Sequence, residues 1–160
     1  MPEVSIITPC YNSAAYIRKT AEAVLSQSFT DWEWLITDDC SSDDSVAIIQ
    51  ALKDKRIHVS MTEKNGGAGQ ARNMSLEKAS GRYVTFLDAD DFWEPDFLEE
   101  MLSFMKQHNA ELAYSSYARC DEHLNPVIAD FVADKEVTFG NLLKTCRLSL
   151  LSSMYDTHRV

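Results

Sequence analysis

Three carboxylates stand close together in the sequence, at the end of an apolar run. Asp88, Asp90 and Asp91 follow residues 83–87, Tyr-Val-Thr-Phe-Leu. A run of this kind is typical of a buried strand, and open α/β sheets bind ligands at the carboxyl ends of such strands. Because adjacent carboxylates repel one another, the cluster favours a bound cation. Oxygen ligands suit Mg²⁺ or Mn²⁺, which proteins bind through one or two carboxylates together with phosphate oxygens of a substrate.

An isolated Asp-x-Asp is also typical of a solvated acidic turn. In that alternative Asp90 or Asp91 helps to cap the next helix and binds no ion. The other residues that the fold brings to the same place must decide between the two interpretations.

Strand patterns and helix patterns alternate four times over residues 1–109. The strands are expected at 4–8, where Pro9 stops the first one, and at 32–37, 57–61 and 82–87; apolar residues at helical spacing follow at 14–25, 46–52, 70–79 and 95–109. This alternation predicts an α/β fold, a three-layer α/β/α sandwich with a mostly parallel central sheet.

Residues 110–160 break this rhythm. Strand patterns at 111–119 and 127–132 flank Asn125-Pro126, residues 139–145 suggest one or two helical turns, and residues 148–155 suggest a last strand. Since the sequence shows no linker or repeat, we expect residues 1–160 to form a single domain.

Composition excludes some partners. The net charge of −10 and the pI near 4.7 argue against nucleic acid and anionic membranes, which attract basic surfaces. No apolar run approaches the roughly 20 residues of a transmembrane helix, and no signal peptide is recognisable. Four widely spaced cysteines suggest reduced thiols. We expect a cytoplasmic protein with no integral membrane segment and no nucleic-acid partner, so that any membrane contact is peripheral, at the inner face.

Four loops should meet at the carboxyl edge of the predicted sheet, namely 8–12, 38–42, 65–73 and 88–91. Tyr11 offers a ring on which a base can stack, and Asp38 or Asp39 can accept a hydrogen bond from a pyrimidine N–H. Arg72 can make charge-assisted bonds to the ligand, while a metal ion bridges Asp90 and two phosphates. This inventory suits a nucleoside diphosphate.

These motifs resemble those of the family 2 glycosyltransferases, which are inverting enzymes with the Rossmann-like GT-A fold. The segments that carry the resemblance are Val4-Ser5-Ile6-Ile7-Thr8-Pro9-Cys10-Tyr11-Asn12, Thr37-Asp38-Asp39-Cys40-Ser41-Ser42-Asp43, Gly69-Gln70-Ala71-Arg72-Asn73 and Gly81-Arg82-Tyr83-Val84-Thr85-Phe86-Leu87-Asp88-Ala89-Asp90-Asp91. Each motif alone is weak, but four in the right order and spacing over about residues 4–117 make the resemblance specific.

The resemblance implies a nucleotide-diphospho-sugar donor, with a UDP-sugar expected, and a saccharide or lipid-linked saccharide as acceptor. It implies a Mg²⁺ or Mn²⁺ cofactor held by Asp88 and, most directly, by Asp90. The usual setting of such enzymes is bacterial cell-surface polysaccharide or lipopolysaccharide biosynthesis. The substrate-binding positions that it implies are Thr8, Pro9, Tyr11, Asp38, Asp39, Arg72, Asp88, Ala89 and Asp90.

Purely structural roles remain open for several of these residues. Thr8 and Asp39 can serve as helix-cap or turn residues, and Arg72 can belong to a structural ion pair. Asp91 fits a cap or turn better than a metal ligand. Trp93 fits the core as well as it fits an acceptor platform.

In one respect the sequence departs from the family pattern. The family's general base follows the acceptor-side segment, which begins here at about residue 110, and no acidic-aromatic signature is recognisable after Tyr117. The acidic residues there are Asp121, Asp130 and Asp134, in expected loops, and Asp156, after the expected last strand. We therefore expect the catalytic base beyond Val160, in a longer enzyme of which residues 1–109 bind the donor.

Two other functions are compatible with parts of the pattern. Phosphohydrolases of the haloacid-dehalogenase type also end a strand in Asp-x-Asp. However, their motif has Thr or Val where Phe92 stands, and it lies on the first strand of the core. The second alternative is a catalytically incomplete module that binds a nucleotide-sugar.

Overall fold

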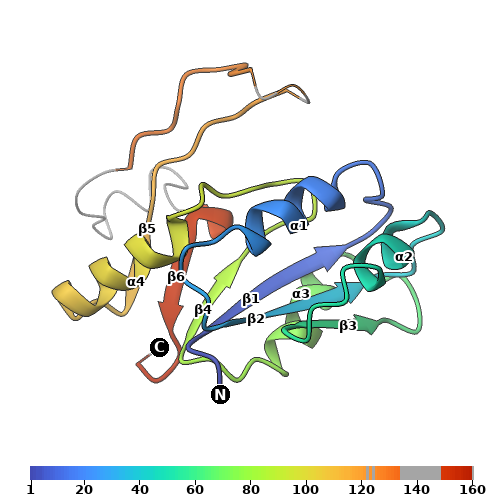
Figure 1. Ribbon diagram of the computed structural model, residues 1–160, viewed down its shortest axis with the longest axis horizontal. Helices are drawn as coiled ribbons and strands as arrows, with labels where there is room; N and C mark the ends of the chain where they lie inside the picture. Colours follow the sequence, from blue (N-terminus) through green and yellow to red (C-terminus); the bar gives the residue numbers. More distant parts are fainter. Residues whose placement is uncertain (122, 124, 134–148, 160) are drawn as a thin grey trace.

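The computed structural model describes residues 1–121, 123, 125–133 and 149–159. In this part of the chain six strands form one sheet in the order β3-β2-β1-β4-β6-β5. Helices lie on both faces of the sheet (Figure 1). The predicted α/β sandwich with a mostly parallel sheet is confirmed.

The strands are β1 (Val4–Cys10), β2 (Trp32–Asp38), β3 (Ile57–Met61), β4 (Tyr83–Phe86), β5 (Leu112–Tyr114) and β6 (Ser153–Asp156). The helices are α1 (Ile17–Leu25), α2 (Ser45–Gln50), α3 (Ala68–Leu76) and α4 (Phe97–His108), with a 3₁₀ turn η1 at Leu150–Ser152. Among the described residues no helix has both the length and the apolar character needed to cross a membrane. Strands β1 to β4 are parallel, and β6 runs antiparallel to both β4 and β5. The carboxyl ends of β1, β2, β4 and β5 therefore lie at the same edge.

Strand β1 is buried on both faces, as expected for a central strand of a parallel sheet. Because successive side chains point to opposite faces, Ile6 packs in the cluster that contains apolar residues of α1, α2 and α4. Ile7 packs on the other face with Leu35 and Val84, where α3 lies against β1 and β2. Both faces of β1 are thus fixed, which in turn fixes where its carboxyl end points.

Contrary to the prediction, Pro9 does not stop β1. The carbonyls of Glu3 and Ile7 accept hydrogen bonds from the N–H groups of Tyr83 and Leu87. The backbone N–H and C=O groups of the odd-numbered residues therefore point toward β4. Pairing with β4 ends at Ile7. At Pro9 the β4 side of the strand is no longer paired, so the lack of an N–H on that side costs no hydrogen bond. On its other side β1 stays paired with β2 as far as Cys10.

Residues 111–132 pair less than predicted. Strand β5 ends at Tyr114, and among the described residues from 115 to 133 the pairing consists of two isolated antiparallel bridges, Tyr117 with Phe131 and Cys120 with Pro126. Pro126 has no N–H to donate, and the Asp121 carboxylate accepts the N–H groups of His123 and Asn125, so the backbone is satisfied locally. The expected last strand is shorter too, because its first half forms η1. The helical turns expected at 139–145 lie outside the described residues.

A buried polar network fastens the start of β4 beside β1. Glu33 Oε1 accepts hydrogen bonds from the hydroxyls of Ser5 and Ser80, at 2.6 and 2.9 Å. Burial would raise the pKa of Glu33, but these bonds and the Ser80 N–H outweigh it and lower the pKa. Ser5 Oγ in turn accepts the Gly81 N–H at 2.9 Å. Gly81 fits this place because a Cβ there would stand 2.7 Å from the Ser5 backbone nitrogen.

We therefore expect Gly81→Ala to force β4 away from β1 and to lower the free energy of unfolding by about 1–3 kcal/mol, the usual effect of overpacking. Gly69→Ala is the control, since a Cβ there meets nothing within 4 Å and Gly69 lies in helix α3. Alanine in a helix is expected to stabilise by up to about 1 kcal/mol. Urea unfolding followed by circular dichroism measures both. A Gly81→Ala chain as stable as the wild type would contradict this account of the β1–β4 contact.

Candidate functional site

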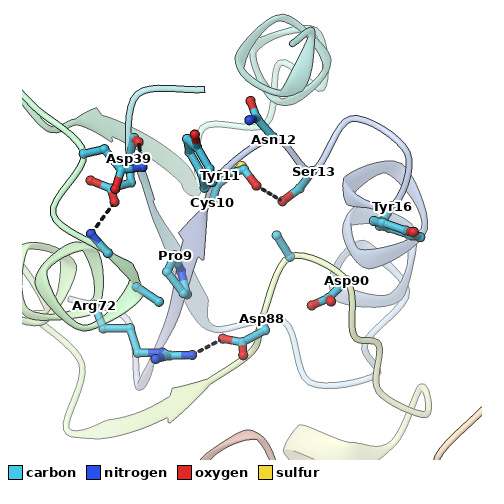
Figure 2. A pocket seen from close by; sticks show the side chains of 14 residues that line it. Pro9, Cys10, Tyr11, Asn12, Ser13, Tyr16, Asp39, Arg72, Asp88 and Asp90 are labelled. Carbon is cyan, nitrogen blue, oxygen red and sulfur yellow. Dashed lines mark hydrogen bonds and ion pairs between the residues drawn. The ribbon is translucent and has the colours of Figure 1, made fainter. Parts of the chain in front are cut away.

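A cavity of about 380 Å³ opens at the carboxyl edge of the sheet. Its lining consists of Pro9, Cys10, Tyr11, Asn12, Ser13, Tyr16, Asp39, Asn65, Gly67, Ala68, Arg72, Asp88, Ala89 and Asp90. Apart from Ser13 and Tyr16, these residues come from the four loops that the sequence predicts to converge, and that convergence is confirmed. Asp39 and Arg72 lie on one side of the cavity, with Asp90 and Tyr16 on the other (Figure 2).

Of the nine predicted substrate-binding residues, Thr8 and Asp38 do not line the cavity. Both are fully buried. Thr8 Oγ1 donates to the Leu87 carbonyl at 2.6 Å and accepts from Trp34 Nε1 at 2.8 Å, so it joins β1, β2 and the end of β4. Asp38 Oδ2 accepts the Ser41 N–H at 3.0 Å and shapes the loop that carries Asp39.

The Asp39 carboxylate organises the glycine-rich loop. It accepts the N–H of Gly67 at 2.6 Å, the N–H of Gly66 at 3.0 Å and the hydroxyl of Thr62 at 2.7 Å. Burial would raise the pKa of Asp39, but these donors outweigh it and lower the pKa. Gly67 has a φ of 84°, a conformation that favours glycine, and helix α3 begins at the next residue. Asp39 therefore holds the turn that places Arg72 beside the cavity.

The acidic loop after β4 presents its carboxylates differently. Asp88 Oδ1 forms an ion pair with Arg72 Nη2 at 2.5 Å, in the cavity wall. Asp90 is exposed to the cavity and has no hydrogen-bond or ion-pair partner among the described residues. Burial, and then the charges of Asp90 and Asp88, raise the pKa of Asp91 to about 6. The loop thus holds carboxylates close enough to interact, with Asp90 free for a ligand.

The acidic loop suits a divalent cation that takes only some of its ligands from the protein. The described residues contain no group of three or more His, Cys, Asp or Glu side chains that could hold a metal alone. Magnesium and manganese sites with one or two carboxylates complete their shell with water and substrate phosphates. The unpartnered Asp90 and the neighbouring Asp88 supply that donor set, and the open cavity leaves space for the phosphates.

Sequence reasoning missed Tyr16 as a cavity residue. It was expected inside a helix over 14–25, but α1 begins at Ile17, so Tyr16 is the N-cap residue and 48% of its surface is exposed. Its spacing from Tyr11, which places aromatic rings at both ends of the β1–α1 loop, was the available signal. Trp93 belongs to the core. Its indole stacks on Phe97, and its Nε1 donates to the Leu151 carbonyl at 3.1 Å.

Comparison with known proteins decides the family. The sequence model of the family described as "Glycosyl transferase family 2" matches residues 5–136 of this chain. The chain belongs to this family. The phosphohydrolase interpretation is therefore wrong, in agreement with the acidic loop following β4, the fourth strand, instead of the first.

Family 2 relatives cover nearly the whole chain. TuaG of Bacillus subtilis, whose name assigns it to teichuronic acid biosynthesis, is 41% identical over 97% of this chain and 62% of its own length. WfgD of Escherichia coli, named a UDP-Glc:alpha-D-GlcNAc-diphosphoundecaprenol beta-1,3-glucosyltransferase, is 37% identical over 96% of this chain and 60% of its own length. This chain thus spans about three fifths of the length of these relatives.

A solved family structure has the same architecture. Residues 1–349 of S. aureus TarS, in complex with UDP-GlcNAc, superpose with a TM-score of 0.81 at 29% sequence identity. The match covers 97% of this chain and 45% of the TarS chain. The GT-A fold that the sequence resemblance implies is therefore confirmed.

The Asp39 network predicts a pH-dependent stability. Because its donors lower the pKa of Asp39 in the folded state, its charge stabilises the fold above the unfolded-state pKa of about 4, and this contribution is lost as the pH falls through the folded-state pKa. We expect Asp39→Asn to unfold at lower urea than the wild type at pH 7, with the difference shrinking as the pH falls below the unfolded-state pKa of about 4 and disappearing once the carboxyl is protonated in the folded state. Asp44→Asn is the control, since Asp44 is exposed and makes no side-chain cap bond. A difference that stays constant with pH would show that the Asp39 charge does not matter.

Proposed function

We propose that the cavity binds the nucleotide-diphospho-sugar donor of an inverting glycosyltransferase. The observation that carries this proposal is the joint position of Arg72, Asp88 and Asp90 in the wall of a cavity that also exposes the Tyr11 ring. A cation, carboxylates and an aromatic face are the groups that a diphosphate, its metal ion and its base require. A solvated acidic turn would need none of the other three loops.

Three of the lining residues have specific roles in this proposal. Tyr11, with 53% of its surface exposed, stacks on the base. Asp39 keeps lone pairs beyond those that its three donors use, and it accepts from the nucleoside while holding the Gly66-Gly67 turn. Arg72 exchanges part of its contact with Asp88 for the diphosphate. Thr8 and Asp38 do not line the cavity; their hydrogen bonds hold the strand ends and the loop that form its wall.

The reaction is displacement of the nucleoside diphosphate by an acceptor hydroxyl at the anomeric carbon. Mg²⁺ or Mn²⁺, held by Asp90 and Asp88, would stabilise the charge that grows on the departing phosphates. Arg72 adds a second positive charge at the same place. Direct displacement also requires a general base within hydrogen-bond reach of the acceptor hydroxyl. We place that base outside the described residues, in the acceptor-side part of the enzyme.

The relatives guide the choice of substrate. The name of WfgD and the ligand of the TarS complex each include a UDP-sugar, and the name of WfgD gives a saccharide linked to diphosphoundecaprenol as its acceptor. We therefore propose a UDP-sugar donor and a saccharide or lipid-linked saccharide acceptor in bacterial cell-surface polysaccharide biosynthesis. We further propose that the enzyme acts in the cytoplasm, peripheral to the inner face of the membrane, where it could reach a lipid-linked acceptor.

The donor site can be tested by calorimetry with this chain. UDP, dTDP, GDP and CMP are titrated with Mn²⁺ and again with EDTA, and the best ligand is repeated with Asp90→Ala. We expect UDP to bind only with Mn²⁺ and to lose at least tenfold in affinity in the variant, as metal-ligand changes typically do. Asp96→Ala is the matched control, because it removes an equal charge from an exposed carboxylate outside the cavity.

Equal weakening by Asp96→Ala would mean that overall charge, and not coordination, controls binding. Metal-independent binding of UDP would contradict the assignment of the acidic loop. Absence of binding for all four nucleotides would contradict the proposed donor site in this chain.

A further inference from the structure

A buried hydroxyl on helix α1 reaches the acidic loop. Thr20 has 1% of its surface exposed and does not line the cavity. Its Oγ1 donates to the backbone carbonyl of Ala89 at 2.9 Å. Ala89 stands between Asp88 and Asp90, so this bond acts at the residue that separates the two carboxylates.

The acidic loop needs such a restraint because its carboxylates repel one another when no cation is present. Among the described residues, the other backbone hydrogen bonds hold only its two ends, and the Arg72 ion pair holds the Asp88 side chain. The Leu87 N–H donates to Ile7 at 3.0 Å, and the Asp91 N–H donates to the Asp88 carbonyl at 3.1 Å. Together with the bond from Thr8 to Leu87, they leave the Ala89 carbonyl to Thr20.

The type and place of Thr20 fit this task. Threonine is a weaker helix former than alanine, and a helical threonine commonly turns its hydroxyl back to the carbonyl four residues earlier. Thr20 instead donates to a loop 69 residues away in the sequence. The methyl of Ala89 is buried in the same core cluster as Ile17 and Ala21 of α1, so the loop is seated on the helix by apolar contact as well.

We propose that Thr20 is a positioning residue that holds Asp88 and Asp90 in the arrangement required for the divalent cation and the diphosphate. This proposal rests on the proposed function. Without the hydroxyl, the Ala89 carbonyl loses its hydrogen bond, and the backbone between the two carboxylates is held only by the apolar packing of Ala89, so Asp90 can shift relative to Asp88. Part of the binding free energy of the cation would then be used to bring the carboxylates together, so the affinity for the cation would fall.

The chain offers a matched control for the loss of a buried threonine hydroxyl. Thr85 Oγ1 donates to the Ser153 carbonyl at the same distance, 2.9 Å, and Thr85 is fully buried. Its bond joins β4 to β6 and does not touch the acidic loop. Valine at either position keeps the size of the side chain and removes the hydroxyl, so we expect both variants to lose a similar amount of stability.

The test compares wild type, Thr20→Val, Thr20→Ser and Thr85→Val. Mn²⁺ affinity is measured at saturating UDP by electron paramagnetic resonance of free Mn²⁺, and hydrogen exchange of the Asp91 N–H is measured without ligands. We expect both valine variants to lower the melting temperature, but only Thr20→Val to weaken Mn²⁺ binding, by about tenfold. Only Thr20→Val is expected to accelerate exchange at Asp91. Thr20→Ser should restore both properties.

Wild-type affinity in Thr20→Val, equal weakening in Thr85→Val, or failure of Thr20→Ser to restore binding would each overturn the proposal. A wild-type chain that binds no Mn²⁺ with UDP would instead contradict the proposed function, and it would reduce Thr20 to a structural residue. The exchange measurement shows independently that Thr20 restrains the loop, because it needs neither metal nor nucleotide.

Discussion

Repulsion among the carboxylates at the end of β4 is the constraint on which the site depends. Burial, and after it the charges of the neighbouring Asp90 and Asp88, raise the pKa of Asp91 to about 6. The electrostatic repulsion is reduced in a different way at Asp88 and at Asp91, and it is left uncompensated at Asp90. Arg72 pairs with Asp88, and burial favours the neutral form of Asp91. Asp90 is exposed and has no hydrogen-bond or ion-pair partner in the described part of the chain. Under the proposed function, a divalent cation at this place would offset the repulsion, and the same cation would attract the anionic diphosphate.

The rest of the fold brings the relieving groups to that place. Strand β1 lies at the centre, and Thr8 joins it to Trp34 of β2 and to Leu87 at the end of β4. On the other face, Asp39 holds the turn at Gly67 from which α3 carries Arg72 into the cavity. The order of the strands thus determines which loops can share a ligand. A buried hydroxyl or glycine far from the cavity can matter because it sets the spacing of these parts.

The sequence was sufficient to predict the convergence of the loops, because alternating strands and helices place all parallel carboxyl ends at one edge. It was not sufficient to predict which side chains face the cavity. Thr8, the last residue of the expected first strand, proved to be turned inward. Asp38 was expected in a loop, but β2 runs one residue further than expected and buries it. The long-range contacts of residues 111–132 were also out of reach, because isolated bridges depend on partners distant in the sequence. Side-chain direction and long-range pairing are set by packing, which local patterns do not contain.

The central claim is that Asp90 and the diphosphate of the donor share one divalent cation. A crystal structure of this chain with UDP and Mn²⁺, with data collected at the manganese absorption edge, tests it most directly. The account predicts one anomalous peak within about 2.5 Å of an Asp90 carboxylate oxygen and of the UDP phosphates, with the base against Tyr11. A peak remote from Asp90, or UDP bound with its phosphates away from the acidic loop, would contradict it.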